Sequence, residues 1–393
     1  MKSNKKINTV KLLDVVSIGG KSVKEFDNEL MYLSTGDLEE SNIVNLEPVT
    51  FDSRPSRANQ LVEINDILFA KMKDTRKTLL INENTKNIIV STGFYVLRAS
   101  NKVLPKYIYH YLNSDYFLNQ KNKLCKGATQ KAINNDGLKQ IDIVLYDDKI
   151  QDKIVELLDK SKELIDKRKE QIKSLDELVK SQFIEMFGDP VSNPKGWDVG
   201  KLGKISSVGS SKRVFVDELV SEGIPFYRGT EIGALSTGEK IEPTLFITKE
   251  HYEKLKDSTG VPVIGDLLMP SICPDGRIWS VDTQMPFYFK DGRVLWIHLE
   301  NSSIDSMFLK HMLREKFNRD YNKIASGTTF AELKIFALKD LDIIMPPIEI
   351  QKKYSNFVKY TDKLKFEMEK SLKQLEDNFN SLMQRAFKGE LFD

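Results

Sequence analysis

The sequence predicts an α+β fold in which two globular α/β domains are each followed by a long helix. Three observations support this prediction. The chain has 393 residues, which is more than one typical hydrophobic core accommodates. Its second half repeats the first at an offset of 200 residues, and each repeat ends in a stretch of about 40 residues without glycine or proline.

The composition is that of a soluble globular protein, with 40% hydrophobic residues, 30% charged residues and a formal net charge of +2. No apolar run approaches the roughly 20 residues that span a bilayer, so we expect no association with a membrane. The basic N-terminus lacks the apolar core of a signal peptide. Cys125 and Cys273 are the only cysteines and lie far apart, which argues against a disulfide framework and favours a cytoplasmic location.

The repeat is anchored by short matching segments. The clearest matches, each 200 residues apart, are Gly127-Ala-Thr-Gln with Gly327-Thr-Thr-Phe, Leu138-Lys139 with Leu338-Lys339, Asp142-Ile143 with Asp342-Ile343, Ile150-Gln151 with Ile350-Gln351, and Phe187 with Phe387. A weaker match joins Asp66 to Asp266. Between these anchors the halves differ almost completely, which indicates a duplicated scaffold with two divergent inserts. The predicted boundaries are 1–148 and 198–346 for the two globular domains, 149–187 for the first long helix, 188–197 for a linker, and 347–393 for the second long helix and tail.

Within the globular domains, the sequence predicts strands with turns between them and a few amphipathic helices. The strand predictions are Leu61–Lys71, Ile88–Leu97 and Val261–Pro270. Tyr107–Leu118 and Ser306–Phe317 have the apolar spacing of amphipathic helices.

The two long helices share one pattern of apolar positions. Their predicted core positions are Ile150, Ile154, Leu157, Ser161, Leu164, Arg168, Ile172, Leu175 and Val179 in the first, and Ile350, Tyr354, Phe357, Thr361, Leu364, Met368, Leu372, Leu375 and Phe379 in the second. The steps are 4-3-4-3-4-4-3-4 in both, which is heptad spacing with one interruption. Two such helices could pack on each other along their lengths. The alternative is two amphipathic helices on separate domain cores.

The sequence offers no catalytic, cofactor or metal site. Gly19-Gly-Lys-Ser22 is not a phosphate-binding loop, because the first glycine of that motif would fall at Val15. No Asn-Pro-Pro-Tyr or Asp-Pro-Pro-Tyr segment of a base methyltransferase occurs. Asp147 and Asp148 suit the start of a helix, where negative charge is favourable. The four histidines lack the spacing of metal ligands: His110, His251, His298 and His311.

Basic residues instead cluster in the segments where the two halves differ, and they predict binding to DNA. The first half has Arg54, Arg57, Lys71, Lys73, Arg76 and Lys77, and the second half has Lys212, Arg213, Arg228, Arg277 and Arg293. Arginine can pair with guanine edges or with phosphates, and lysine with phosphates. We expect Arg277 to occupy the place of Lys71–Lys77 in the repeat. Each of these residues could instead be an ordinary solvated charge.

A second matched feature is a pair of short segments rich in small and hydroxyl residues. The first contains Gly127, Thr129 and Lys131, and the second contains Thr328 and Thr329. Hydroxyl groups and nearby backbone amides suit contacts with DNA phosphates. A structural turn before the last strand is the alternative.

Several of these segments resemble the specificity (S) subunits of Type I restriction-modification enzymes. The residues that carry the resemblance are Glu185–Pro190 with Trp197, Leu341–Gln351, Leu382–Leu391 and Ser326–Thr329. Together with the duplication, the resemblance covers nearly the whole chain. One departure is Tyr146-Asp147-Asp148, which stands where the second half has Pro346-Pro347-Ile348.

The resemblance implies a subunit that is not itself an enzyme. Two target recognition domains, 1–148 and 198–346, would each read one half of a split, asymmetric target in double-stranded DNA. The long helices would form an antiparallel coiled coil that docks two methyltransferase (modification) subunits, and restriction subunits could join. S-adenosylmethionine, ATP and magnesium would belong to those partners, so no cofactor is expected here. A fused enzyme would need motifs that the chain lacks, and a scaffold without a DNA role would not explain two divergent basic inserts.

Overall fold

A computed structural model describes residues 8–300, 303–327 and 331–391. The chain divides into two compact units, which we call the first unit (1–171 with 368–393) and the second unit (172–367). Each unit therefore contains one globular domain and about half of each long helix. The predicted boundaries separate the helices from the domains, whereas each unit combines them.

The first unit is built from two main sheets and three short helices. Its strands are β1 (Thr9–Lys11), β2 (Val16–Ile18), β3 (Lys21–Ser22), β4 (Leu30–Leu33), β5 (Leu38–Glu39), β6 (Asn42–Ile43), β7 (Glu47–Val49), β8 (Ala58–Leu61), β9 (Asp66–Ala70), β10 (Thr78–Leu80), β11 (Ile88–Ser91), β12 (Phe94–Ala99) and β13 (Asp142–Val144). The helices are the 3-10 turn η1 (Leu12–Asp14), α1 (Pro105–Leu112), α2 (Asp115–Leu124) and α3 (Asn135–Leu138).

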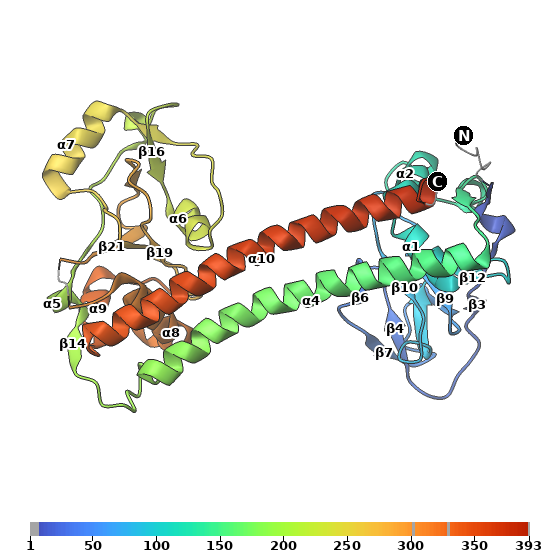
Figure 1. Ribbon diagram of the computed structural model, residues 1–393, viewed down its shortest axis with the longest axis horizontal. Helices are drawn as coiled ribbons and strands as arrows, with labels where there is room; N and C mark the ends of the chain where they lie inside the picture. Colours follow the sequence, from blue (N-terminus) through green and yellow to red (C-terminus); the bar gives the residue numbers. More distant parts are fainter. Residues whose placement is uncertain (1–7, 301–302, 328–330, 392–393) are drawn as a thin grey trace. The chain divides into compact units, whose positions relative to one another are not determined.

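The main sheets of the first unit have the strand orders β10-β9-β12-β2 and β3-β8-β11-β4-β7, and β1 pairs with β13. One core lies between the four-stranded sheet, α1, α2 and the long helices, and a second lies between the two sheets. Helices α1 and α2 lie beside the C-terminal end of the long helix α10 (Ile348–Lys388), as Figure 1 shows.

The second unit repeats the central part of this plan. Its strands are β14 (Val199–Lys201), β15 (Ser207–Gly209), β16 (Ile224–Tyr227), β17 (Phe246–Ile247), β18 (Leu267–Pro270), β19 (Trp279–Ser280), β20 (Tyr288–Phe289), β21 (Val294–His298) and β22 (Asp342–Ile344). Its helices are α5 (Leu202–Ile205), η2 (Val216–Glu218), α6 (Gly229–Ser236), α7 (Lys249–Thr259), α8 (Ser306–Ile324) and α9 (Ile335–Lys339). The four-stranded sheet β15-β21-β18-β19 corresponds to β2-β12-β9-β10.

The repeat holds at the level of strand register. Phe69 on β9 faces Tyr95 on β12, and Met269 on β18 faces Leu295 on β21, so both positions shift by 200 residues. The inserts differ, because the five-stranded sheet of the first unit is replaced by the sheet β17-β16-β20 with α6 and α7 in the second. The duplicated scaffold with divergent inserts is therefore confirmed.

Three predicted elements of the first unit are each split in the structure. The predicted strand Leu61–Lys71 contains the last residue of β8, a turn at Ile64-Asn65, and β9. The predicted strand Ile88–Leu97 is two strands, β11 and β12, with a turn at Thr92-Gly93. The predicted helix Tyr107–Leu118 is two helices, because the Ser114 side chain caps α2 by accepting a hydrogen bond from the Phe117 backbone amide at 3.2 Å. A serine or threonine cap of this kind starts a new helix rather than continuing the old one.

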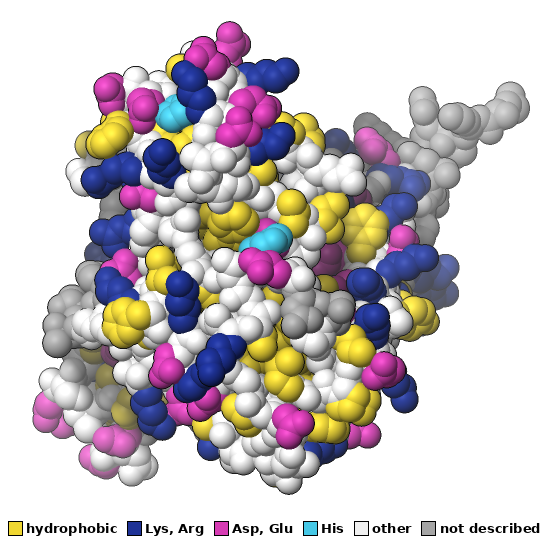
Figure 2. All heavy atoms as spheres, turned by 90° about the vertical axis from the view of Figure 1, so that its left-hand side faces the viewer, with side chains coloured by type: hydrophobic (Ala, Val, Ile, Leu, Met, Phe, Trp, Pro, Cys, Tyr) yellow, Lys and Arg dark blue, Asp and Glu magenta, His cyan; other side chains and the backbone are white. Residues whose placement is uncertain are grey.

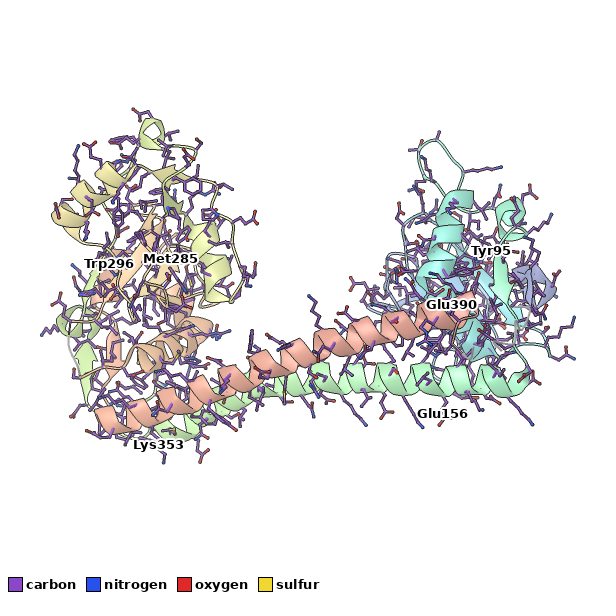
Figure 3. The ribbon with its side chains drawn as sticks, turned by 45° about the horizontal axis from the view of Figure 1, so that its top comes forward. Tyr95, Glu156, Met285, Trp296, Lys353 and Glu390 are labelled. Carbon is purple, nitrogen blue, oxygen red and sulfur yellow. The ribbon has the colours of Figure 1, made fainter. Side chains whose placement is uncertain are left out.

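The long helices α4 (Asp148–Phe187) and α10 run antiparallel in each unit. In the first unit Lys169 pairs with Glu376 at 2.9 Å, and Leu158 shares a core with Met383. In the second unit Asp176 pairs with Lys365 at 2.7 Å, and the rings of Phe183 and Tyr354 lie 5.5 Å apart. Residue numbers thus rise along α4 as they fall along α10, as an antiparallel coiled coil requires. Side chains such as Glu156 and Lys353 project from the outer faces (Figure 3).

The predicted interruption of the heptad is wrong. Leu157, Leu164 and Leu364 are 37%, 55% and 36% exposed. The buried and half-buried positions are instead Ile154, Leu158, Ser161, Ile165, Arg168, Ile172, Leu175 and Val179 on α4, and Tyr354, Val358, Thr361, Lys365, Met368, Leu372, Leu375 and Phe379 on α10. Both series follow 4-3-4-3-4-3-4 without a break, which is regular heptad packing.

The first long helix starts differently from the second in sequence but not in geometry. The Ile150 and Gln151 amides both donate to the Asp147 carbonyl at 3.0 Å, and the Asp147 carboxylate also accepts from Ile150. In α10 the Pro347 carbonyl takes the same two bonds from Ile350 and Gln351. Aspartate therefore replaces proline at this position without changing the helix start.

Candidate DNA interface

The central β-hairpins of the two units carry predicted basic residues at matching places. In the first unit Lys71–Lys77 connects β9 to β10, with Leu79 facing Leu68. In the second unit Arg277 lies in the connection from β18 to β19, with Trp279 facing Leu268. The predicted equivalence of Arg277 with the end of Lys71–Lys77 is confirmed.

A short loop packs beside each hairpin connection. In the first unit Lys126 and Ala132 exchange two backbone hydrogen bonds of 2.9 and 3.0 Å, and Ile133 donates to the Lys71 carbonyl at 2.9 Å. Gly127 has a φ of +133°, and a Cβ there would come within 2.3 Å of the Gln130 carbonyl oxygen, so only glycine fits. The loop therefore has a fixed shape.

The described residues on either side of the corresponding segment of the second unit make the same hydrogen bonds. Ser326 and Glu332 exchange two backbone hydrogen bonds of 2.9 Å, and Leu333 donates to the Ser271 carbonyl at 2.7 Å. Thr129, at the tip of the first loop, is exposed. Thr328 and Thr329 lie outside the described residues.

A buried polar side chain makes hydrogen bonds to the backbone beside each hairpin connection. In the first unit the Lys121 ammonium donates to the Thr75 carbonyl at 2.6 Å and to the Ala70 carbonyl at 3.3 Å. In the second unit Tyr321 stands at the equivalent position, and its hydroxyl donates to Ala331 at 3.0 Å and accepts from the Cys273 amide at 2.8 Å. Burial lowers the pKa of Lys121 to about 8.

Several predicted DNA-binding residues of the first unit make contacts within the protein. The Lys71 ammonium donates to the Thr92 carbonyl at 2.8 Å and lies 4.4 Å from the centroid of the Tyr95 ring. Desolvation by burial lowers the pKa of Lys71. Arg54 donates to the Ala58 carbonyl at 3.2 Å and lies over the Phe51 ring.

The remaining predicted residues of the first unit divide into paired and exposed groups. Arg76 forms an ion pair with Asp115, which also accepts from Gln384 on α10. Lys77 donates to the Thr35 carbonyl at 2.7 Å, and Lys73 lies 3.9 Å from Asp74. Arg57, Thr129 and Lys131 are exposed, as is the paired Arg76.

In the second unit the predicted basic residues fall into two groups. Lys212 and Arg213 are exposed, and Arg213 lies 3.7 Å from Asp291. Arg228 and Arg277 instead line a cleft of about 430 Å³ together with Lys290 and Arg293. Three arginines of this cleft each form an ion pair with a carboxylate of the protein.

Lys290 is a cleft residue that the sequence did not single out. It is one lysine between β20 and β21 with no cluster around it, so nothing in the local sequence marks it. Only the fold, which brings residues 228–230, 270–272, 277, 290 and 293 together, reveals the cleft. On the face drawn in Figure 2, lysine and arginine side chains are spread among acidic ones and form no single basic patch.

Two of the four histidines, His110 and His311, are packed against the long helices. His110 is 4% exposed, and its Nε2 lies 2.7 Å from the Asp159 carboxylate on α4. His311 packs edge-on against Tyr354, and burial lowers its pKa to about 3. Among the described residues, no group of three His, Cys, Asp or Glu side chains could hold a metal ion. No helix within the described ranges is long and apolar enough to cross a membrane.

The chain carries one scaffold twice, with divergent inserts and two long helices, which is the architecture of a modular protein with two related domains. The family model of the Type I restriction modification DNA specificity domain matches residues 4–175 and 194–377. The chain belongs to this family and carries two copies of the domain. Members of the family are non-catalytic specificity subunits.

Individual relatives agree with this assignment. A Haemophilus influenzae protein named as a type I restriction enzyme specificity subunit is 28% identical over 263 residues, which cover 65% of this chain and 64% of that protein. The match thus spans less than two thirds of the relative.

Solved structures show the same fold over the whole chain. A chain from a study of complex assembly and conformational transition of the type I R-M system has a TM-score of 0.69 at 19% identity, with 100% of both chains covered. The S subunit from M. genitalium has a TM-score of 0.53 at 16% identity, with 98% of both chains covered. The HsdS subunit from Thermoanaerobacter tengcongensis has a TM-score of 0.50 at 19% identity, covering 100% of this chain and 99% of that one.

Proposed function

We propose that this chain reads a bipartite, asymmetric target in double-stranded DNA and positions methyltransferase subunits on it, with restriction subunits joining in the full complex. The globular parts 1–148 and 198–346 would be the two target recognition domains. The observation that carries the proposal is the duplication itself. Two central sheets share one register, whereas the inserts around them differ in fold and in charge.

The charge distribution supports a different contact surface in each half. In the first unit we propose that the exposed Arg57, Thr129 and Lys131 face the DNA, since the rigid loop around Gly127 presents the last two. In the second unit we propose Lys212, Arg213 and the cleft around Arg228 and Arg277. Different side chains at matching places would read different half-sites, so the target would be asymmetric.

The outer faces of the long helices support docking of partner subunits. Several large apolar residues there are exposed rather than packed in the coiled-coil seam: Leu157, Leu164, Leu178, Tyr360, Leu364 and Phe366. Exposed apolar residues along a helix pair are typical of surfaces that a partner protein covers. The internal repeat would offer such a surface twice, which suits two methyltransferase subunits.

The proposal is tested by exchanging residues 198–346 for the matching segment of a related subunit. Methylated sites are then mapped in cells that also produce the methyltransferase subunit. We expect one half-site to change and the other to remain, because each half is read by its own domain. A simultaneous change in both half-sites would contradict modular reading. Loss of all methylation while the complex still assembles would contradict the domain boundaries.

A second test addresses catalysis. The purified chain, incubated with S-adenosylmethionine and target DNA, should transfer no methyl groups. Addition of the methyltransferase subunit should restore transfer, because the active site belongs to that partner. Turnover by the chain alone would exclude the proposed division of roles.

A further inference from the structure

A cleft opens in each unit at the end of the central strand. In the first unit it has a volume of about 420 Å³ and is lined by Lys71, Tyr95, Ile133, Asn134, Asn135 and Asp136. In the second unit it has about 430 Å³ and includes Ser271, which stands where Lys71 stands in the repeat. Both units therefore have a cleft beside the same position of the shared scaffold, but the charged side chains that line the two clefts differ.

Four cationic side chains line the cleft of the second unit, and carboxylates orient three of them. Arg228 pairs with Glu231 at 2.6 Å, and Arg277 pairs with Asp275 at 2.8 Å. Arg293 pairs with Glu332 at 3.0 Å. A guanidinium has five N–H donors, so one carboxylate fixes its direction and leaves other donors for a ligand.

Lys290 adds a fourth positive charge to the cleft. It is half-buried, and no carboxylate of the described ranges pairs with its ammonium group. Four cleft cations therefore face three carboxylates, and Glu332 is shared with Lys334 at 2.5 Å. The net charge of these side chains is positive, which favours binding of an anion.

The start of α6 borders the cleft, and its Glu231 carboxylate accepts hydrogen bonds from the Arg228 amide and the Thr230 hydroxyl, both at 2.9 Å. Gly229 and Thr230, the first two residues of this eight-residue helix, line the cleft. Backbone amides in the first turn of a helix have no partner within the helix and attract anions. Gly229 packs against Pro270, whose Cβ would lie 3.4 Å from an added Cβ, so the helix start is held close to the strand end.

The side chains that line this cleft fit a phosphate better than a base. No aromatic ring is among them to stack on a base, and no asparagine or glutamine is present to pair with adenine, so guanine edges and phosphates remain as partners for the arginines. Arginine, lysine, a threonine hydroxyl and helix amides are the groups that hold DNA phosphates.

The cleft of the first unit has the opposite character. Its one cation, Lys71, donates to the Thr92 carbonyl at 2.8 Å and lies over the Tyr95 ring. Asp136 lines the same cleft and pairs with Lys139 at 3.4 Å, and Tyr95 donates to Asn135 at 2.6 Å. One cationic side chain lines this cleft, against four in the second-unit cleft, so it attracts an anion less strongly.

We propose that the second-unit cleft binds one phosphate of the DNA backbone and that the first-unit cleft does not. The residues that form the binding cleft are Arg228, Thr230, Arg277, Lys290 and Arg293. This proposal rests on the proposed function and refines it. The two halves then differ in how they bind DNA as well as in what they read. The second half contributes a sequence-independent, salt-sensitive contact at this cleft.

The experiment measures DNA affinity of the assembled methyltransferase complex, with its target duplex, at several salt concentrations. It compares the natural chain with Lys290→Met, which keeps the length of the side chain and removes the charge. The matched control is Lys254→Met on α7, since that exposed lysine pairs with Glu250 and lies outside the cleft. Lys290→Arg serves as the rescue variant.

We expect Lys290→Met to weaken binding several-fold and to lower the slope of log affinity against log salt by about 0.9, as loss of one phosphate contact predicts. Unrelated duplexes should lose affinity by the same factor, and the methylated sequence should stay the same. Lys254→Met should leave the slope unchanged, and Lys290→Arg should restore it.

Three results would overturn the proposal. An unchanged affinity and slope for Lys290→Met would show that no phosphate lies at this cleft. An unchanged slope with relaxed preference at one base pair would show that the cleft reads a base. Both of these would leave the proposed function standing, whereas failure of the natural complex to bind its duplex would overturn the proposed function as well.

Discussion

Gln151 and Gln351, 200 residues apart, make the same three hydrogen bonds in their respective units. Each is fully buried near the start of a long helix. Gln151 accepts from the Leu104 amide at 2.9 Å and donates to the Lys102 and Tyr146 carbonyls at 3.0 and 2.8 Å. Gln351 accepts from Asp305 at 2.8 Å and donates to Ser303 and Pro346 at 3.1 and 2.7 Å. Each glutamine thus fixes a long helix to its own globular domain.

Replacing either glutamine should destabilise its unit strongly. Gln151→Ala or Gln351→Ala removes three hydrogen bonds of a fully buried side chain, and each such bond contributes about 0.5–1.5 kcal/mol. We expect a loss of at least about 2 kcal/mol, measured by chemical denaturation followed by circular dichroism. Gln374→Ala on the exposed face of α10 is the control and should change stability by less than about 0.5 kcal/mol. Equal effects of all three changes would contradict the role of the buried pair.

The register of the coiled coil gives a second prediction. Ile165 is 3% exposed and Leu164 is 55% exposed, although the sequence alone favoured Leu164 as the core residue. Ile165→Ala should therefore cost about 2 kcal/mol or more, as large-to-small changes in cores do. Leu164→Ala should cost less than about 0.5 kcal/mol. Chemical denaturation of the two variants decides the register, and a larger loss for Leu164→Ala would favour the interrupted pattern.

The sequence predicts where the long helices begin and end better than it predicts which of their residues face each other. Both ends of the first long helix and the start of the second could be predicted within one residue, because glycine and proline are absent from 149–187 and 348–388. The facing residues could not, because Leu157-Leu158 and Leu164-Ile165 each offer two adjacent apolar side chains. At 3.6 residues per turn either member can face a partner, and only the packing selects one.

Lys121 gives a prediction about pH. It is 1% exposed, and burial lowers its pKa from 10.5 to about 8. Between pH 8 and 10.5 the unfolded chain keeps a proton on this amine that the folded chain has released. Raising the pH through this window therefore favours the folded state, by roughly 3 kcal/mol in total.

The measurement compares urea denaturation midpoints at pH 7.5 and pH 10 for the natural chain, Lys121→Met and Lys123→Met. The natural chain and Lys123→Met, in which an exposed lysine is changed, should gain stability relative to Lys121→Met as the pH rises. A constant difference between Lys121→Met and the natural chain across this range would show that Lys121 has an ordinary pKa in the folded state.

The candidate DNA contacts show the same division between local and long-range information. The sequence identified Arg228 and Arg277 because they are arginines in divergent segments, and the structure places both in one cleft. It could not show that Arg76 pairs with Asp115, 39 residues away, or that Lys77 donates to Thr35. Such contacts depend on how the inserts fold, and the inserts lack the periodic patterns that make helices predictable.

The last prediction concerns the two long helices as a spacer. We propose that their length sets the number of unread base pairs between the half-sites. The ion pairs Lys169–Glu376 and Asp176–Lys365 bracket the midpoint, so paired insertions after Ile172 and after Lys370 would leave both intact. Four added residues lengthen each helix by about 6 Å, which corresponds to one or two base pairs at about 3.4 Å each.

Because four residues rotate a helix by about 400°, the apolar seam of an otherwise regular heptad should remain nearly aligned. Two added residues rotate it by about 200° and should disrupt packing, so this shorter insertion should abolish methylation. Methylated sites are mapped in cells that carry each variant with the methyltransferase subunit. We expect the four-residue variant to keep both half-site sequences and to widen the gap between them. An active four-residue variant with the original gap would show that something other than helix length sets the spacing.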